Sequence, residues 1–347
     1  MQTCRLMAWS LILLVVAGCN QGTSPEKVAK EKEASAKTSA HADRMKIAVI
    51  PKGTMHDYWQ AIHTGALAAA ADHKDVEVIW RGPLIEGKPD EQRKILEGFA
   101  EMGVDAIVIA PADREKMVEP IEKVIEGGTP VVVIDSPLAS DKIVSYVGTD
   151  NEKLGQLAAK EMAQTLKGKG GVIVLRQLEV DSSTSARVEA FLHELKERAP
   201  DIEILSSDVY GGATTETTTI AAQKLIEKFG DKIKGWYCPT LGTTLGTLYS
   251  LQNLEKLGTV TVIGSDFNGD LIIALRNGGV RGLMLQDPVS IGKKGVNAAI
   301  DHLEGKDVPP KELTGAYLLR KEYIDAPDFK RLYSPDMQKW LGKGTKD

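Results

Sequence analysis

The sequence predicts an α/β protein made of two doubly wound lobes, each with a parallel sheet. Continuous apolar runs such as AIVIA and VVVID are typical of strands buried on both faces, and such strands occur in parallel sheets covered by helices. These runs alternate with longer amphipathic segments that favour helices. The alternation is complete by residue 135 and then begins again, and two successive βαβα arrays indicate two lobes.

The first array supplies the first lobe. Its strands are predicted at Lys46–Pro51, Val76–Trp80, Val104–Ala110 and Pro130–Asp135. Its helices are predicted at Tyr58–Ala71, Asp90–Met102 and Arg114–Glu126. The segment GGTP at 127–130 ends the last helix and starts the following strand, because glycine favours helix ends and proline cannot continue a helix.

The second array repeats the pattern. Its strands are predicted at Val172–Leu175, Ile202–Ser206, Lys234–Cys238, Val260–Gly264 and Gly282–Gln286. Its helices are predicted at Ser185–Ala199, Thr217–Phe229, Thr244–Leu257, Leu271–Asn277 and Val289–Leu303. Trp80 and Trp236 are interpreted as core or rim residues.

The N-terminus reads as an export signal. Arg5 precedes a short apolar run, Leu11–Val16, which is too short to span a bilayer. The small residues before Cys19 resemble a bacterial lipobox, so residues 1–19 are predicted to be a lipoprotein signal peptide with Cys19 as the lipidated residue; the alternative is an ordinary secretory signal. Residues 20–44 contain no Phe, Trp or Tyr and are predicted to be a flexible tether.

Composition excludes several classes of protein. The chain has 347 residues, enough for about two domains, with 43 Lys and Arg against 48 Asp and Glu, a formal net charge of −5. This balance argues against a nucleic-acid partner. Cys4 leaves with the signal and Cys19 carries lipid, so Cys238 has no disulfide partner. The histidines lack metal-binding spacing and no nucleotide-binding or nucleophile-elbow motif occurs, so no metal, no cofactor and no catalytic residue is expected.

Polar and aromatic side chains follow the predicted strands where these end. In α/β sheets, ligands bind at the carboxyl ends of strands. The segments there are 51–59, 80–83, 111–113, 135–137, 176–187, 210–212, 239–240, 265–268 and 286–287. They combine carboxylate, amide, guanidinium, hydroxyl and aromatic groups, a mixture that suits a polyhydroxylated ligand.

Several collinear motifs resemble one family. They are IAVIPKGTMHDYWQAIHTGA, VDAIVIAPAD, PVVVIDSP, SYVGTDNEKLGQLAA, SARVEAF, VIGSDFNGD and LMLQDPVSIGKKG. From about Lys46 to Tyr323 the chain resembles the type I periplasmic binding proteins, specifically the ribose-binding-like sugar branch of ABC transporter substrate-binding lipoproteins. The resemblance implies two lobes joined by a three-stranded hinge.

The resemblance also implies a ligand site. Carried over to this sequence, its residues are Tyr58, Trp59, Asp113, Asp135, Arg187, Asp266 and Gln286, with Thr240 and His56 at positions where the family has other residues. The family often has Asn at the position of His56 and Asn-Asp at Thr240-Leu241. Ser136 stands where the ribose branch has an arginine, so one guanidinium is missing. The pocket therefore differs from a ribose site.

Structural alternatives exist for these residues. Tyr58 and Trp59 precede a helix and can form a contact at its N-terminus. Asp135 and Asp266 can cap following helices. Arg187 is predicted in the first turn of a helix, where a cation is unfavourable, so a hydroxylated or anionic partner would account for it.

The predicted domains are an N-terminal lobe of residues 45–149 plus 287–316 and a C-terminal lobe of 150–286 plus 317–347. The crossovers are expected near Gly148–Asp150, Gln286–Asp287 and Thr314–Ala316. The resemblance implies a monomeric, exported, membrane-anchored protein, at the periplasmic side or the cell surface, that captures a sugar or polyol and delivers it to an ABC permease and its ATPase.

Other functions remain as alternatives. The same lobes can present a sugar or furanose signal to a membrane sensor or chemoreceptor. A carbohydrate hydrolase using Asp135 and Asp266 is disfavoured, because the two carboxylates come from lobes that move. A gene regulator is not expected, since a signal and tether precede the lobes. The sequence leaves open the sugar, its affinity, the membrane that holds the lipid, and whether the output is transport or signalling.

Overall fold

A computed structural model describes residues 44–342 of the chain. The predicted signal peptide, the lipidated Cys19 and nearly all of the predicted tether lie outside these residues. The described residues from Met45 onward form one compact unit. Within residues 44–342, no helix combines the length and the apolar character that a membrane crossing needs.

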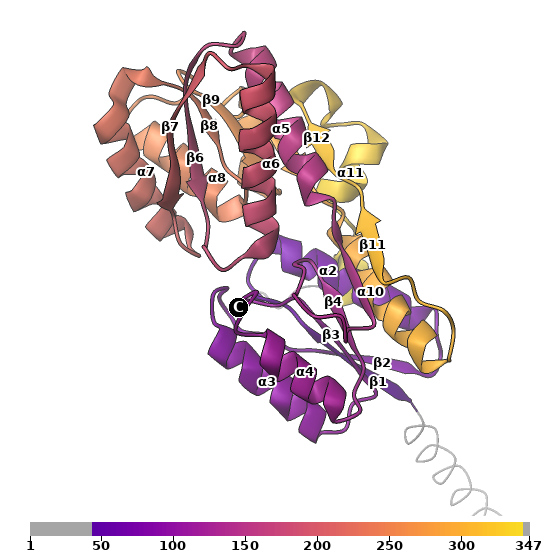
Figure 1. Cartoon of the computed structure of the whole chain (residues 1–347). Coiled ribbons are helices and arrows are strands. Elements are labelled where there is room, and N and C mark those ends of the chain that lie inside the picture. Colours follow the sequence, from indigo (N-terminus) through magenta and orange to yellow (C-terminus); the bar gives the residue numbers. More distant parts are fainter. Residues whose placement is uncertain (1–43, 343–347) are drawn as a thin grey trace, which may run out of the picture. The chain divides into compact units, whose positions relative to one another are not determined.

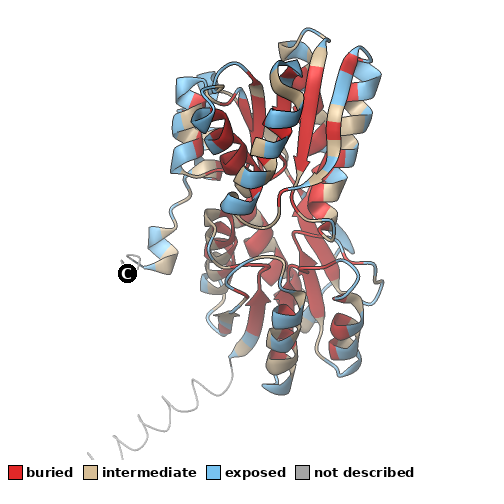
Figure 2. Cartoon of the chain, turned by 90° about the vertical axis from the view of Figure 1, so that its left-hand side faces the viewer, coloured by how far each residue is buried: buried red, intermediate tan, exposed pale blue. Residues whose placement is uncertain are grey.

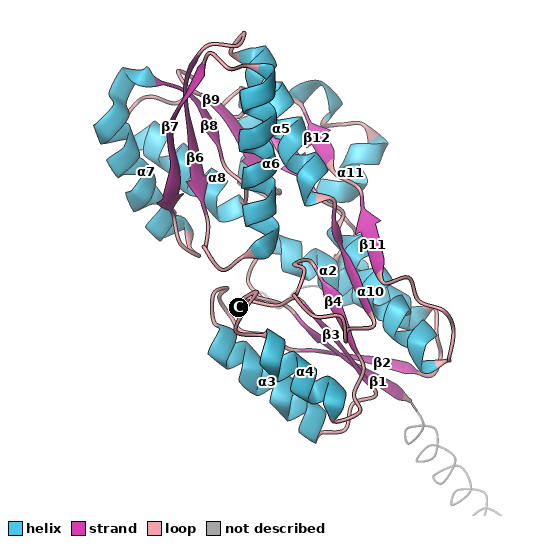
Figure 3. Cartoon of the chain, viewed as in Figure 1, coloured by secondary structure: helices cyan, strands magenta, loops and turns pink. Residues whose placement is uncertain are grey.

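Two six-stranded sheets have the same strand order (Figures 1 and 3). The first sheet runs β11-β5-β4-β3-β1-β2 and contains β1 (Met45–Ile50), β2 (Val76–Trp80), β3 (Ala106–Ile109), β4 (Val131–Ile134), β5 (Ser145–Thr149) and β11 (Lys311–Thr314). The second runs β12-β10-β9-β8-β6-β7 and contains β6 (Gly170–Arg176), β7 (Ile202–Tyr210), β8 (Ile233–Tyr237), β9 (Thr261–Ser265), β10 (Gly282–Leu285) and β12 (Tyr317–Leu319). Neighbouring strands are parallel except for β12, which pairs antiparallel with β10. The predicted fold class is confirmed.

Helices cover both faces of the first sheet. Helices α2 (Asp57–Ala71) and α10 (Pro288–Leu303) lie on one face, and α3 (Pro89–Glu101) and α4 (Val118–Glu126) lie on the other (Figure 1). The alternation of side chains along β1 matches this arrangement. Ile47 and Val49 join the core cluster that contains residues of α2 and α10, while Ala48 and Ile50 join the cluster with residues of α3 and α4.

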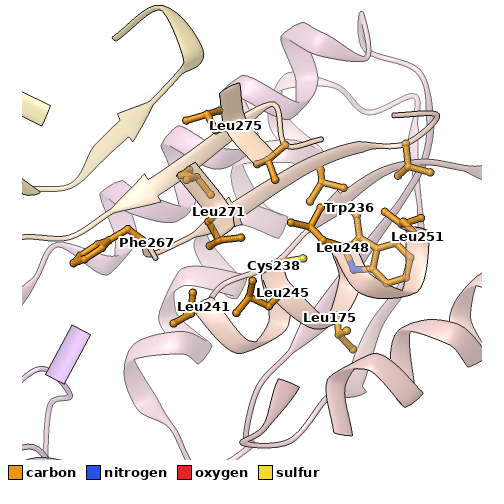
Figure 4. Packing of buried hydrophobic residues seen from close by; sticks show 14 of the residues in the cluster. Leu175, Trp236, Cys238, Leu241, Leu245, Leu248, Leu251, Phe267, Leu271 and Leu275 are labelled. Atoms are coloured by element: carbon orange, nitrogen blue, oxygen red, sulfur yellow. The ribbon is translucent and has the colours of Figure 1, made fainter. Parts of the chain in front are cut away.

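The second lobe is layered in the same way. Helices α5 (Asn151–Thr165) and α6 (Ser182–Arg198) pack against one face of its sheet. The cluster on the other face takes residues from α7 (Thr215–Phe229), α8 (Leu241–Asn253), α9 (Gly269–Asn277) and α11 (Pro327–Tyr333). Trp236 is fully buried in this cluster beside Leu248 and Leu251, which confirms its interpretation as a core residue (Figure 4). Figure 2 shows buried strands enclosed by helices with exposed outer faces.

The described chain passes between the lobes at three crossovers, as predicted. They lie between β5 and α5, between β10 and α10, and between β11 and β12. The end of the described chain differs from the expected division, which assigned 317–347 to the second lobe. Helix α12 (Gln338–Leu341) contacts α2 of the first lobe. The chain leaves the second-lobe helix α11 at Ser334-Pro335, where proline prevents the helix from continuing.

Three helices start at positions that differ from the predicted ones, and side-chain caps account for two of them. Helix α6 begins at Ser182 rather than Ser185, because the Asp181 carboxylate accepts hydrogen bonds from the backbone of the first turn. Helix α8 begins at Leu241 rather than Thr244, because Thr240 and Thr243 form a capping box. Helix α4 begins at Val118 rather than Arg114.

Three strands lie outside the predicted ranges. Strand β5 (SYVGT) contains Gly, Ser and Thr rather than a continuous apolar run, and β11 (KELT) is an edge strand with exposed residues. Strand β12 has only three residues. Each is held by pairing with a strand of its own sheet, to β4, β5 and β10 respectively. Local sequence does not reveal such strands because their neighbours in the sheet stabilise them.

Candidate functional site

A cavity lies where the carboxyl ends of the two sheets face each other. Its empty volume, counting the open mouth, is about 470 Å³. Every residue predicted to contact ligand lines it except Asp113. The polar and aromatic lining residues are Lys52, His56, Tyr58, Trp59, Glu86, Asp135, Gln177, Asp181, Ser183, Thr184, Arg187, Thr240, Asp266 and Gln286.

Two aspartates occupy equivalent positions in the two lobes. Asp135 directly follows β4 and Asp266 directly follows β9, and these strands hold the same place in their sheets. Both residues have left-handed backbones, with φ of 63° and 65°, a conformation that aspartate adopts more readily than most residues. Such strained backbones occur at functional sites. Neither residue caps a following helix, because α9 is capped by Asn268 and a loop leads from Asp135 to β5.

A continuous set of hydrogen bonds joins these two carboxylates. The Tyr58 hydroxyl donates to Asp135 Oδ1 at 2.6 Å and lies 3.3 Å from Gln286 Oε1. Gln286 Nε2 donates to Asp266 Oδ1 at 2.8 Å, and the Thr149 hydroxyl donates to Gln286 Oε1 at 2.7 Å. Gln286 follows β10 at a crossover, so this network passes from the first lobe through the hinge to the second.

Arg187 projects from α6, and its buried guanidinium forms hydrogen bonds to the protein with some of its N–H groups. Its Nε donates to Asn151 Oδ1 at 2.7 Å and its Nη1 to the Pro239 carbonyl at 2.9 Å, and the residue is 2% exposed. These contacts use two of the five N–H donors of the guanidinium. Burial raises the pKa of Asp266, and the charge of Arg187 opposes that shift. Arg187 is in the second turn of α6 rather than the first, so its predicted conflict with the helix dipole does not arise.

Lys52 supplies a cation beside Ser136, the residue that stands where the ribose branch has an arginine. Its ammonium lies 2.8 Å from Asp135 Oδ2 and 2.9 Å from Asp181 Oδ2, and it donates to the Ser136 hydroxyl at 2.5 Å. Burial of Lys52 disfavours its charge, but these carboxylates outweigh that effect and raise its pKa. Lys52 and Asp181 both lie in segments that the sequence placed at strand ends, yet neither was predicted as a site residue.

Glu86 is a second site residue that the sequence did not indicate. It lies in the long loop between β2 and α3, beyond the strand-end segment at 80–83. Trp59 Nε1 donates to its Oε1 at 2.7 Å, and Gln177 Nε2 of the other lobe donates to its Oε2 at 3.2 Å. Burial raises the pKa of the Glu86 carboxyl. The Tyr58 and Trp59 rings meet edge to face at 5.0 Å, and both line the cavity rather than only packing at the helix start.

Asp113 has a local structural role. It is buried outside the cavity, and its Oδ1 accepts hydrogen bonds from the backbone N–H groups of Glu115 and Lys116, both at 2.9 Å. Helix α4 begins at Val118, after this turn. Thr240 lines the cavity, but its hydroxyl also caps α8.

The cavity carries more carboxylates than cations. Glu86, Asp135, Asp181 and Asp266 face Lys52 and Arg187. The described part of the chain contains no group of three His, Cys, Asp or Glu side chains placed to hold a metal ion. Buried carboxylates with remaining acceptor positions suit hydroxyl donors, and the Tyr58 and Trp59 rings suit the C–H face of a ring.

Comparison with known proteins gives a consistent result. A family model described as a periplasmic binding protein domain matches residues 47–307. The D-ribose/D-allose-binding protein of Pseudomonas aeruginosa is 26% identical over 300 residues, covering 84% of this chain and 92% of the relative. The xylitol-binding protein of Mycolicibacterium smegmatis is 23% identical over 290 residues, covering 83% and 80%.

A solved structure extends the comparison to the fold. An ABC transporter solute binding protein from Agrobacterium vitis with bound D-fucose is 28% identical, with a TM-score of 0.79, and the match covers 83% of this chain and 99% of that one. By their names, these relatives are binding proteins and not enzymes, as the sequence predicted for this chain.

Proposed function

Because this chain belongs to the periplasmic binding protein family, we propose that it is an exported protein that captures a sugar or sugar-like polyol between its lobes. The single observation that carries the proposal is the pair of left-handed aspartates, Asp135 and Asp266, which meet at one cavity from opposite lobes. Arg187 and the two rings complete a set that complements hydroxyl groups and a ring face.

Capture works through closure of the lobes. A ligand that touches only one lobe makes half of its contacts, whereas a ligand between the lobes reaches Asp135 and Tyr58 on one side and Arg187 and Asp266 on the other. The ligand therefore stabilises the closed arrangement by its differential affinity for it. The closed protein then delivers its ligand to the permease of an ABC transporter, which its cytoplasmic ATPase drives. The relatives named for ribose, allose and xylitol support this class of ligand.

The location follows from the N-terminus. In this proposal Cys19 carries the lipid and residues 20–44 hold the folded unit away from the membrane surface. The protein then works on the outer side of the membrane that holds its permease. Mass spectrometry of the exported protein tests this directly, since lipidation predicts a mature chain that starts at a diacylated or triacylated Cys19.

A ligand screen followed by one variant tests the binding function. Thermal unfolding of the full chain is measured with pentoses, hexoses and polyols, since a tight ligand raises the melting temperature by mass action. Asp266→Asn keeps a residue suited to the left-handed backbone but removes the charge. We expect it to weaken binding of the sugar at least about tenfold in calorimetry, because a hydrogen bond to a charged group is lost.

The matched control is Asp231→Asn, an exposed aspartate paired with Lys256 away from the cavity. It should leave affinity unchanged. The proposal fails if no neutral sugar or polyol raises the melting temperature, or if both variants bind the ligand as the unmodified protein does.

A further inference from the structure

We propose that Lys52 is a positioning residue that couples the lobes: closure brings Asp181 of the second lobe onto an ammonium that Asp135 of the first lobe already holds. This inference rests on the proposed function, because it concerns the same cleft. It adds a lobe-to-lobe ion pair to the contacts that the ligand makes.

The geometry divides the contacts of Lys52 between the lobes. Within the first lobe its ammonium lies 2.8 Å from Asp135 Oδ2 and 2.5 Å from the Ser136 hydroxyl. Across the cleft it lies 2.9 Å from Asp181 Oδ2. Lys52 is 3% exposed and each aspartate is 5% exposed, so water screens this cluster little.

Asp181 is fixed by its own lobe. Its Oδ1 accepts hydrogen bonds from the backbone N–H groups of Ser183 at 3.0 Å and Thr184 at 3.2 Å, as the cap of α6. The other oxygen, Oδ2, is the one that meets Lys52. Each carboxylate is therefore held within its own lobe. As the lobes move, the ion pair between Lys52 and Asp181 has to form or break, together with the 3.4 Å hydrogen bond from the Ser136 hydroxyl to Asp181 Oδ1.

Without the ammonium, closure would be opposed. Asp135 and Asp181 each place an oxygen within 3 Å of the same nitrogen, so in its absence two buried carboxylates would face each other across the cleft. Like charges at close range repel each other strongly in buried surroundings. Lys52 thus replaces a repulsion between the lobes with an attraction.

Neighbouring contacts place this ion pair among other links between the lobes. The Ser182 hydroxyl donates to the Pro137 carbonyl at 3.0 Å, and the Arg114 N–H donates to the Val180 carbonyl at 3.2 Å. Lys52 also orients the ligand site, because its bond to Asp135 Oδ2 leaves Oδ1 beside the Tyr58 hydroxyl. One residue therefore serves both closure and the direction of a ligand-facing carboxylate.

The test measures lobe separation in the full chain before any sugar is added. Fluorophores are introduced as unnatural residues at the exposed positions Lys94 on α3 and Lys224 on α7. In Lys52→Met we expect the ratio of closed to open molecules to fall at least about tenfold, because a buried charge partner has been lost. Lys142→Met is the matched control: Lys142 also pairs with two carboxylates, Glu122 and Glu126, but within one lobe. It should leave lobe separation unchanged.

A second variant distinguishes loss of the charge interaction between the lobes from damage to folding. Asp181→Asn should also favour the open form, and combined with Lys52→Met it should restore part of the closure lost in the single lysine variant, because the facing carboxylates are reduced to one. Damage to folding would not be relieved by a second substitution. If Lys52→Met does not fold, Asp181→Asn alone still tests the coupling.

The inference is overturned if the cleft variants leave lobe separation unchanged, if Lys142→Met shifts it equally, or if the double variant opens as far as both single effects added together. Failure of the proposed function looks different. In that case no sugar or polyol binds the unmodified protein, while the distances without sugar still report on Lys52.

Discussion

At the scale of single residues, backbone conformation determines what an aspartate after a strand does more than the residue type does. Asp113, Asp135 and Asp266 all follow strands of the two sheets, and the sequence treats them alike. Asp113 turns back to bond its own loop, whereas the other two have left-handed backbones and line the cavity. The sequence located all three loops but not the backbone angle that separates a ligand-facing carboxylate from a turn-forming one.

Asp181 should make stability depend on pH in acid. Burial alone would raise its pKa, but Lys52 and the hydrogen bonds from Ser183 and Thr184 lower it to about 2. In the unfolded chain the pKa of an aspartate is about 3.9. A carboxyl with a lowered folded pKa stabilises the fold above its unfolded value and loses that contribution as pH falls through the folded value. The stabilisation should therefore be complete above about pH 4 and disappear towards about pH 2.

Urea unfolding of the unmodified protein and Asp181→Asn checks this. At pH 6 the variant should be less stable by about 2 kcal/mol, and the difference should shrink as the pH falls towards 2. The other carboxyls titrate in both proteins, so their contribution cancels in the difference between the two free energies of unfolding. A difference that stays constant from pH 6 to pH 2 would show that Asp181 is not held as a carboxylate by the fold.

At the scale of helices and strands, close helix packing positions the second-lobe cation. Helices α5 and α6 approach at Gly155, where an added Cβ would lie 2.2 Å from the carbonyl oxygen of Arg187. Two helices of the first lobe also pack closely at glycines. A Cβ at Gly65 of α2 would lie 2.0 Å from the backbone of α10, and a Cβ at Gly292 of α10 would lie 2.0 Å from the backbone of α2. A glycine in a helix is visible in the sequence, but the helix that it faces is not.

Gly155→Ala should therefore disturb both packing and the site. We expect a loss of about 1–3 kcal/mol in the free energy of unfolding, because the new methyl group has to push α6 away. Ligand affinity should fall with it, since the displaced backbone carries Arg187. Denaturant unfolding and calorimetry measure the two effects.

Gly98→Ala is the control for this substitution. Gly98 lies within α3, and an added Cβ there meets nothing within 4 Å. The free energy of unfolding of this variant should rise by about 0.4–1 kcal/mol, because alanine loses less backbone entropy on folding than glycine. If Gly155→Ala and Gly98→Ala changed the free energy of unfolding and the ligand affinity equally, the role given to the α5–α6 contact would be contradicted.

At the scale of the whole molecule, the cleft combines charges that neither lobe holds alone. The first lobe contributes Lys52, Glu86 and Asp135, and the second contributes Asp181, Arg187 and Asp266. Four carboxylates against two cations leave the closed cleft negative. A negative, buried site repels anions, so ligand charge should matter as much as ligand shape.

Anionic derivatives should therefore bind poorly. For the neutral sugar found by the thermal screen, we expect the matching sugar acid or sugar phosphate to bind at least about tenfold more weakly. Calorimetry on the matched pair measures this. Glu86→Gln should narrow the difference, because it removes one negative charge while an amide oxygen still accepts from Trp59. Equal or tighter binding of the anion would contradict this charge assignment.

The sequence by itself determined the fold class, most strand positions and the loops that surround the cavity. These features depend on local patterns, namely apolar runs, helix periodicity and turn residues, which each segment carries within itself. Only the tertiary structure decided that strands β5, β11 and β12 form, that α12 lies against the first lobe, and that Lys52, Glu86 and Asp181 belong to the site. Those outcomes depend on partners distant in the chain, because an edge strand needs its neighbour and a buried ammonium needs carboxylates from both lobes.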